Sequence, residues 1–369
     1  MALLSRNGKL KRIDEQVIVI TGASSGIGLA TARLAAERGA RVVLSSRNEQ
    51  DLRLACDEIR RDGGTASYVV ADVADPLAVD RIAEAAMREF GGFDTWVNNA
   101  GVSIYGKLIE MPLEDKRRLF DTNFWGVVHG CRTAVRHLRH RGGALINIGS
   151  IVSDRAIPLQ GVYSASKHAV QGYTDALRME LEHDRIPISV TLVKPAAINT
   201  PFVEHARNYM AEAPELPPPV YAPEVVADAI LRCAEKRIRE ITVGGGGRMF
   251  TMMGKVAPRS TDLYMERALF SQQRTDRRSP ETDDSLYQAG RGGRAWGPYE
   301  GHVMRSSAYT KAMMSDAARF LPLIALGVGF AAMRRRQRVP SSPAFARDYG
   351  APAHGTNTPD VVREKARST

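Results

Sequence analysis

Tyr163 and Lys167 stand four residues apart in the stretch GVYSASKHAV, which begins at Gly161 and has the pattern of a helix. Residues at this spacing share one helix face, so the phenol and the ammonium group can lie together. A free phenol titrates near pH ~10, and a nearby cation lowers that pKa by stabilising the phenolate. The pair therefore suits a general acid or base, although many helices carry the same spacing without any chemistry.

Two other polar residues precede this pair. Ser150 ends the apolar run ALINIGS 13 residues before Tyr163, and Asn123 lies in DTNFWG within a helical stretch. A serine at a strand end is also an ordinary helix cap, and an asparagine inside a helix is also found at kinks and caps. Ser150, Tyr163, Lys167 and Asn123 are the four candidate catalytic residues.

A glycine-rich stretch, TGASSGIG, follows the apolar run at residues 17–21 and places glycines at positions 22, 26 and 28. The spacing is GxxxGxG and differs from the GxGxxG of the common dinucleotide fingerprint. In both patterns the missing side chains let the backbone approach a pyrophosphate, and the following helix offers N–H groups and a positive dipole. A plain tight connection after a strand can contain the same glycines.

These residues require elements that hold them in place, and residues 14–200 alternate between apolar strand patterns and helical patterns. We expect strands at 17–21, 41–46, 67–73, 95–101, 144–150 and 188–195, and a seventh near EITVGG at residues 240–245. Near-continuous apolar strands alternating with helices predict an α/β fold: a Rossmann-type, doubly wound parallel sheet with helices on both faces. The candidate polar residues follow the ends of these strands, where ligands bind in such sheets.

The second of these strands ends in LSSRN, with Ser46 and Arg47 and without an acidic residue. A carboxylate there would bind the ribose 2′-hydroxyl of NAD. A guanidinium suits a 2′-phosphate by its charge and fork geometry. The sequence therefore predicts NADP(H) in preference to NAD(H), whereas a solvated Arg47 would leave Ser46 compatible with either cofactor.

Taken together, these motifs resemble the short-chain dehydrogenase/reductase family, in its branch with TGxxxGxG and YxxxK motifs, over residues 14–247. The resemblance implies that Ser150 binds the substrate oxygen and that Tyr163 exchanges a proton with it. It implies that Lys167 lowers the pKa of Tyr163 and binds the nicotinamide ribose, and that Asn123 holds a water in a proton relay. Asn98 and Ala100, in the NNAG segment, resemble residues that stabilise the sheet and line the adenosine ribose.

The same resemblance implies the cofactor-binding residues. In KPAAINTP, Pro195 and Thr200 match the family's PGxxxT segment, while Ala196 stands where the family has glycine. The expected cofactor contacts are Gly22, Ser24, Gly26, Ile27, Gly28, Ser46, Arg47, Asp72, Val73, Asn99, Ala100, Gly101, Tyr163, Lys167, Pro195 and Thr200.

We expect four regions along the chain: a lead at residues 1–13, the catalytic domain at 14–247, a basic extension at 248–337 and a disordered tail at 338–369. The net charge is +10, and residues 240–369 hold 20 Lys and Arg against 12 Asp and Glu. A basic extension can meet nucleic acid or anionic lipid, or can simply be solvated. We expect no nucleic acid partner. The three cysteines are scattered and form no CxxC pair, so we predict neither a disulfide framework nor a structural metal site. This use of cysteine suits a reducing compartment.

The extension contains an apolar segment at residues 320–333, followed by RRRQR. Its 14 residues are fewer than the ~20 that a membrane-spanning helix needs. Residues 317–338 are therefore predicted either to contact a membrane surface or to pack as a helix on the enzyme body. We expect a cytoplasmic protein with membrane association through this segment.

The sequence predicts an oxidoreductase that interconverts a carbonyl and a secondary or primary alcohol by hydride transfer with NADP(H). The alternative is a nucleotide-binding regulatory or scaffolding protein that uses its basic extension for membrane or partner contact. The substrate is expected to be a small molecule, possessing apolar character if Phe202, Tyr209, Met210, Leu216 and Tyr221 line the pocket rather than the core. The family resemblance also implies a homo-oligomer.

Overall fold

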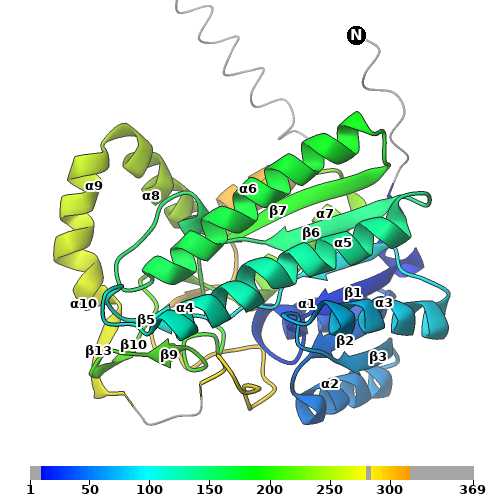
Figure 1. Ribbon diagram of the computed structural model, residues 1–369, viewed down its shortest axis with the longest axis horizontal. Helices are drawn as coiled ribbons and strands as arrows, with labels where there is room; N and C mark the ends of the chain where they lie inside the picture. The colour runs from blue at the N-terminus through cyan, green and yellow to red at the C-terminus, as the bar shows by residue number, and fades with distance from the viewer. Residues whose placement is uncertain (1–9, 280–283, 316–369) are drawn as a thin grey trace, which may run out of the picture. The chain divides into compact units, whose positions relative to one another are not determined.

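The structure is a computed structural model that describes residues 10–279 and 284–315. Within these residues a parallel sheet of seven strands has the order β12-β7-β6-β4-β1-β2-β3 (Figure 1). The predicted Rossmann-type sheet is confirmed. Its strands are β1 (Val17–Thr21), β2 (Arg41–Ser46), β3 (Thr65–Val70), β4 (Thr95–Asn98), β6 (Gly143–Ile148), β7 (Ile188–Pro195) and β12 (Glu240–Val243).

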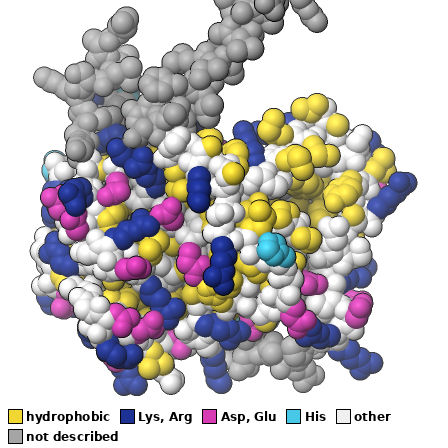
Figure 2. Space-filling view, turned by 180° about the vertical axis from the view of Figure 1, so that it is seen from behind, with side chains coloured by type: hydrophobic (Ala, Val, Ile, Leu, Met, Phe, Trp, Pro, Cys, Tyr) yellow, Lys and Arg dark blue, Asp and Glu magenta, His cyan; other side chains and the backbone are white. Residues whose placement is uncertain are grey.

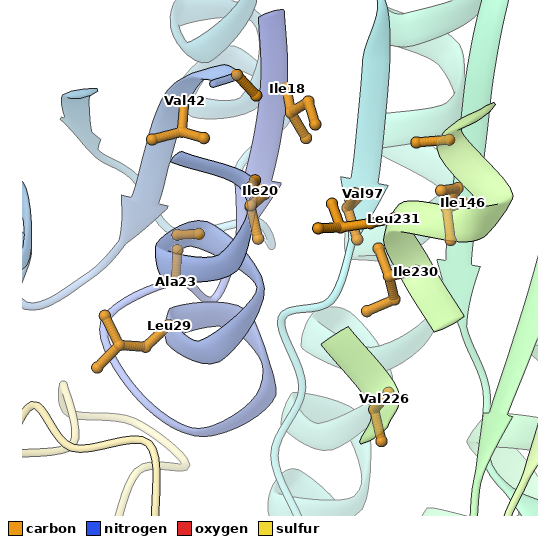
Figure 3. Close-up of a cluster of buried hydrophobic side chains, with 14 of the residues drawn as sticks. Ile18, Ile20, Ala23, Leu29, Val42, Val97, Ile146, Val226, Ile230 and Leu231 are labelled. Atoms are coloured by element: carbon orange, nitrogen blue, oxygen red, sulfur yellow. The ribbon is translucent and has the colours of Figure 1, made fainter. Parts of the chain in front are cut away.

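Alternating side chains of each strand feed two apolar layers, one on each face of the sheet. In β1, Ile18 and Ile20 join one buried cluster, and Val17 and Val19 join the other. The first cluster, part of which Figure 3 shows, packs against α1 (Gly26–Glu37), α2 (Glu49–Arg61) and α7 (Pro223–Glu235). The second packs against α3 (Pro76–Phe90), α5 (Gly126–Leu138) and α6 (Gly161–His183). Because both faces are covered, apolar residues predominate in the central strands.

Local signals fix where the helices begin and end, as in α3. Its N-cap Asp75 accepts a hydrogen bond from the Leu77 N–H at 2.9 Å, and Pro76 occupies the first turn, where it has no bond to lose. Gly91 ends the helix at φ +74°, a left-handed conformation that glycine adopts without strain. The chain then enters β4.

A buried polar network crosses the centre of the sheet. Asn98 on β4 pairs in register with Asn147 on β6, and its Nδ2 donates to Asn147 Oδ1 at 2.8 Å. Trp96 Nε1 donates to Asn98 Oδ1 at 2.7 Å, and Asn147 Nδ2 donates to Thr174 Oγ1 on α6 at 2.9 Å. These bonds satisfy side chains that would otherwise be costly to bury, and they explain an asparagine within a central strand.

The residues after 247 contain helices that their weak periodicity did not predict. These are α8 (Gly245–Val256), α9 (Pro258–Tyr264), α10 (Phe270–Gln272) and α11 (Ala308–Met314). On α8, Met249, Met252, Met253 and Val256 form a stripe at helical spacing and are at least half exposed. Figure 2 shows hydrophobic side chains gathered in this part of the molecule. The division of the chain at residue 247 stays a prediction.

Short strands tie this extension back to the catalytic domain. β13 (Arg274–Arg278) pairs with β10 (Glu212–Pro214), and β14 (Val303–Met304) pairs with β11 (Val220–Tyr221), which also pairs with β8 (Ala197–Ile198). A third small sheet joins β5 (Ile104–Tyr105) to β9 (Arg207–Asn208). The extension therefore reaches the loops that surround the carboxyl ends of the strands.

Among the described residues, no helix has the length and apolar character needed to cross a membrane. The apolar segment 320–333, the expected contact region 317–338 and the tail 338–369 lie outside the described residues, as do residues 1–9 of the predicted lead. The expectations for these segments stay predictions.

The asparagine network yields a stability test on α5. A Cβ placed on Gly130 would lie 1.9 Å from Asn98 Oδ1, so Gly130→Ala must displace the network. We expect it to lower the free energy of unfolding by about 1–3 kcal/mol in urea denaturation. Gly172 on α6 has open space at its Cβ position, so Gly172→Ala should be neutral or should raise that free energy by up to about 1 kcal/mol. Equal effects of the two substitutions would refute the packing argument.

Candidate active site

The turn between β1 and α1 is packed so closely that two of its positions admit only glycine. Gly22 has φ +65°, and a Cβ there would lie 2.7 Å from Ala100 Cα. At Gly28 a Cβ would lie 2.2 Å from the Gly22 carbonyl oxygen. The missing side chains thus bring the first turn of α1 against β1 and leave the turn's backbone facing the cleft.

Hydrogen bonds lock this turn to the NNAG segment that follows β4. Thr21 Oγ1 accepts from the N–H groups of Asn99 and Ala100 at 3.1 and 3.2 Å. Asn99 Nδ2 donates to the carbonyls of Thr21 and Gly22 at 2.9 and 3.0 Å. The two motifs, which are far apart in the sequence, therefore form one rigid wall.

Two charged residues stand at the ends of the neighbouring strands. Asp72, beyond β3, accepts from the Ala74 N–H at 3.0 Å and from Arg118 Nη2 at 2.5 Å. Burial acts to raise the pKa of Asp72, but these hydrogen bonds and the charges of Arg118 and Arg47 lower it overall. Arg118, on α4 (Leu113–Phe120), was missed by the sequence reasoning, because only the fold brings it to the end of β3.

Arg47, at the end of β2, is half-buried and faces a remote part of the chain. Its guanidinium donates to the carbonyl of Ser285, and to those of Leu286 and Tyr287 at 3.4 Å each. Burial lowers the pKa of Arg47 below that of a solvated guanidinium. The negative charge of Asp72 opposes this lowering, and the positive charge of Arg118 adds to it. Arg47 is therefore more than a solvated surface charge.

Ser150, Tyr163 and Lys167 border one cavity of about 270 Å³ at the carboxyl ends of the strands. Ser150 accepts from the Val152 N–H at 3.3 Å, which caps the short turn Ile151–Ser153, and its Oγ lies 3.5 Å from the Pro195 carbonyl oxygen. Ser150 is therefore a helix cap that also borders the cavity, and its binding of a substrate oxygen stays a prediction.

Tyr163 and Lys167 lie together on α6, as their spacing predicted. Lys167 Nζ lies 5.7 Å from the centroid of the Tyr163 ring and donates to the Ile148 carbonyl at 2.8 Å. Burial lowers the pKa of Lys167 to about 8. Burial also raises the pKa of Tyr163 to about 12, and the hydrogen bond with Ser150 opposes that rise. The expected lowering of the phenol's pKa is therefore not found among these residues, because desolvation of the phenolate outweighs the stabilising contacts.

Asn123 lies behind the cavity wall, in a π-helical turn (Asp121–Trp125) between α4 and α5. It is fully buried, accepts from the Val102 N–H at 2.8 Å and donates to the Val102 carbonyl at 2.9 Å. Its Nδ2 also donates to Ser166 Oγ at 3.2 Å, and Ser166 donates to the Tyr163 carbonyl at 2.7 Å. The π-turn thus aims Asn123 at the start of α6, a use to which such turns are often put near functional sites.

Of the predicted catalytic and cofactor-binding residues, all but Asn123 and Gly28 border the same cavity, and Gly28 packs behind the turn. Within the described residues, no group of three His, Cys, Asp or Glu side chains could hold a metal ion. The predicted residues that line the cavity are Gly22, Ser24, Gly26, Ile27, Ser46, Arg47, Asp72, Val73, Asn99, Ala100, Gly101, Ser150, Tyr163, Lys167, Pro195 and Thr200.

The five residues expected around the substrate separate in the structure. Phe202 and Leu216 border the cavity, and the Phe202 ring lies 5.6 Å from that of Tyr163. Tyr221 is buried in the sheet core, Tyr209 hydrogen-bonds the buried Asp115, and Met210 does not border this cavity. Sequence spacing alone could not separate these roles, because the segment has little regular periodicity.

A parallel sheet with a glycine-rich turn at its first strand and a Ser-Tyr-Lys group at the cleft defines a Rossmann-type oxidoreductase. The chain belongs to the short-chain dehydrogenase family, whose sequence model matches residues 16–211. It is 47% identical over 308 residues to the oxidoreductase YxnA of Bacillus subtilis (strain 168), covering 82% of this chain and 86% of YxnA.

Two solved structures show the same fold. An alcohol dehydrogenase from Thermococcus sibiricus complexed with 5-hydroxy-NADP is 27% identical, with a TM-score of 0.54 over 62% of this chain and 95% of that one. A short-chain dehydrogenase/reductase from Burkholderia phymatum in complex with NAD is 27% identical, with a TM-score of 0.57 over 72% of this chain and 98% of that one. Both cofactor types therefore occur among the neighbours.

The buried ammonium of Lys167 predicts a pH dependence of stability. An unfolded lysine keeps its proton to about pH 10.4, whereas Lys167 in the folded chain releases it near pH 8. Between these values the unfolded state binds more protons, so this residue makes the free energy of unfolding rise with pH. Relative to Lys167→Met, the wild type should gain about 2–3 kcal/mol between pH 7 and pH 10 in urea denaturation.

Lys255 provides the control, because it is exposed and faces water. Lys255→Met should leave the pH dependence of stability unchanged. A constant difference between wild type and Lys167→Met across this pH range would contradict the assignment.

Proposed function

We propose that the protein interconverts a carbonyl and a secondary or primary alcohol with NADP(H) as cofactor. The observation that carries the proposal is the joint placement of Ser150, Tyr163 and Lys167 on a cavity that is also bordered by the glycine-rich turn. A chain that only bound a nucleotide would have no use for this group, which disfavours the regulatory or scaffolding alternative. The oxidoreductase function itself follows from the family.

The lining of the cavity supports a dinucleotide as its ligand. Gly22 and Gly26 border the cavity where α1 begins, and a pyrophosphate would meet the helix N-terminus there. The Gly26 N–H itself donates to the Arg294 carbonyl. Asp72 and Val73 border the same cavity beyond β3 and would lie near the adenosine. Arg47 supports NADP(H), because no carboxylate stands at the end of β2 to bind a 2′-hydroxyl.

A bound nicotinamide supplies or accepts the hydride at the substrate carbon. Tyr163 donates the proton to the carbonyl oxygen during reduction, and a pKa of about 12 keeps the phenol protonated at neutral pH. Ser150 holds the substrate oxygen by a hydrogen bond. Lys167 places a cation beside the phenol, where it stabilises the charge that develops when the proton leaves. Asn123 positions the start of α6 through Ser166.

We propose a small substrate with an apolar body. Phe202, Leu216 and Ile157 border the cavity and exclude water near Tyr163. The α8 stripe adds an exposed apolar surface to the enzyme. Contact of residues 317–338 with a membrane, a cytoplasmic location and homo-oligomer formation remain predictions.

Removing the Tyr163 hydroxyl tests the mechanism. Tyr163→Phe keeps the ring and its contact with Phe202 but has no proton to transfer. We expect NADPH affinity to stay within about twofold, while kcat on an active carbonyl substrate falls at least about 100-fold, the effect of losing a general acid. NADPH absorbance in a panel of apolar ketones and aldehydes gives the rate, and unchanged turnover would exclude Tyr163 as the acid.

Replacing Arg47 tests the cofactor preference. Arg47→Ala removes the guanidinium expected to meet the 2′-phosphate, and charge-assisted hydrogen bonds contribute about 1.5–3 kcal/mol each. We expect NADPH affinity to fall about 10- to 100-fold and NADH affinity to change little, as measured by fluorescence titration. An equal loss for both cofactors would show that Arg47 has a structural role only.

A further inference from the structure

Residues 284–300, which we call the strap, cross the cleft from one rim to the other. Ser285, Ala289 and Gly290 border the same cavity as the Ser-Tyr-Lys group. These residues belong to the C-terminal extension, which lies outside the part of the chain that carries the glycine-rich and YxxxK motifs. The strap therefore brings a late part of the chain into the nucleotide site.

One end of the strap accepts hydrogen bonds from the Arg47 guanidinium. Both terminal nitrogens of its guanidinium donate to strap carbonyls, one to Ser285 and the other to Leu286 and Tyr287. Arg118 adds a bond from Nε to the Leu286 carbonyl at 3.0 Å, so two guanidinium groups face the same strap backbone. Asn48 Nδ2 donates to the Gly290 carbonyl at 2.8 Å and holds the next turn of the strap to the end of β2.

The other end of the strap occupies the start of α1. The Gly26 N–H donates to the Arg294 carbonyl at 3.0 Å, at the helix N-terminus where a pyrophosphate would bind. The Arg294 side chain is held by Glu204, whose two carboxylate oxygens lie 2.6 and 2.5 Å from Arg294 Nη2. Trp296 Nε1 donates to Glu224 Oε1 at 2.7 Å and fixes the strap beyond this point.

A buried carboxylate anchors the Arg47 end. Asp115 accepts from the Tyr287 hydroxyl at 2.7 Å and from Arg207 Nη1 at 2.9 Å, and it also accepts from Tyr209. Arg207 Nε donates to Asp284 at 2.7 Å. Removing the Tyr287 hydroxyl therefore loosens the strap without altering Arg47, the glycine-rich turn or the Ser-Tyr-Lys group.

The region that matches a relative extends past residue 247. The match to YxnA covers 82% of this chain, which is more than residues 1–247 can supply, so it reaches into the extension. The matches to the two solved structures cover 62% and 72% of this chain, and they cover 95% and 98% of the solved chains.

We propose that the strap is a part of the cofactor site that sets the preference between NADP(H) and NAD(H) by competing for Arg47. This inference rests on the proposed function. A 2′-phosphate that binds the two terminal nitrogens of Arg47 must compete there with the neutral strap carbonyls, and its charge-assisted bonds are the stronger ones. A cofactor with a 2′-hydroxyl leaves the strap in place at this end. The free energy spent on releasing the strap is therefore subtracted from the binding of NADP(H) alone.

The two ends of the strap provide a matched pair of variants in the full-length protein. Tyr287→Phe weakens the Arg47 end, and Glu204→Gln weakens the Gly26 end, which faces the pyrophosphate common to both cofactors. Dissociation constants of NADPH and NADH are measured by fluorescence titration, and circular dichroism verifies folding. Ser285→Ala, which removes a hydroxyl bond to the His205 carbonyl at 2.9 Å, is a second variant at the Arg47 end.

We expect Tyr287→Phe and Ser285→Ala to tighten NADPH binding about three- to tenfold, the effect of one anchoring hydrogen bond, and to leave NADH within about twofold. Glu204→Gln should change the two affinities by the same factor. Equal changes for both cofactors at the Arg47 end, or no change in either, would overturn the strap's role in preference. Failure of the wild type to bind either cofactor would overturn the proposed function instead.

Discussion

The close approach between the glycine-rich turn and the segment after β4 is the constraint on which the rest of the site depends. Gly28 must lie against the Gly22 carbonyl, and Asn99 must reach back to the end of β1. With that contact made, α1 starts at the cleft, where its first N–H, that of Gly26, donates to the Arg294 carbonyl. The parallel order of the sheet then places the ends of β2, β3, β6 and β7 along the same edge.

Burial governs the chemistry of the pair on α6. The same loss of water raises the pKa of the Tyr163 phenol to about 12 and lowers that of the Lys167 ammonium to about 8, because burial disfavours the charged form of each group. With a pKa of about 8, Lys167 still carries its charge for the most part at neutral pH. A neutral phenol is the form that donates a proton, which suits reduction of a carbonyl. Any charge that develops on the phenol lies next to Lys167, within a wall fixed by Ser150 and the π-turn of Asn123.

The C-terminal extension changes how the cofactor cleft is built. In the described residues, the backbone of the strap uses the two kinds of donor, a guanidinium and a helix N-terminal N–H, that a phosphorylated dinucleotide also uses. The strap is held from outside the cleft by Asp115 and Glu204, which are parts of α4 and of the loop after β8. The proposed competition for Arg47 therefore depends on residues that do not border the cavity.

The sequence by itself determined the succession of strands and helices along the chain and the identity of the motif residues. Apolar β-branched runs predict strands because both faces of the sheet are covered, and the spacing of Tyr163 to Lys167 and to Ser150 is a property of the chain alone. Only the tertiary structure decided the state of these groups. The rise in the Tyr163 pKa comes from the walls around it, which no local pattern records. Arg118, Asp115 and the strap reach the cleft through contacts between distant segments, and a polar, weakly periodic stretch gives no sign of which carbonyl it will present to Arg47.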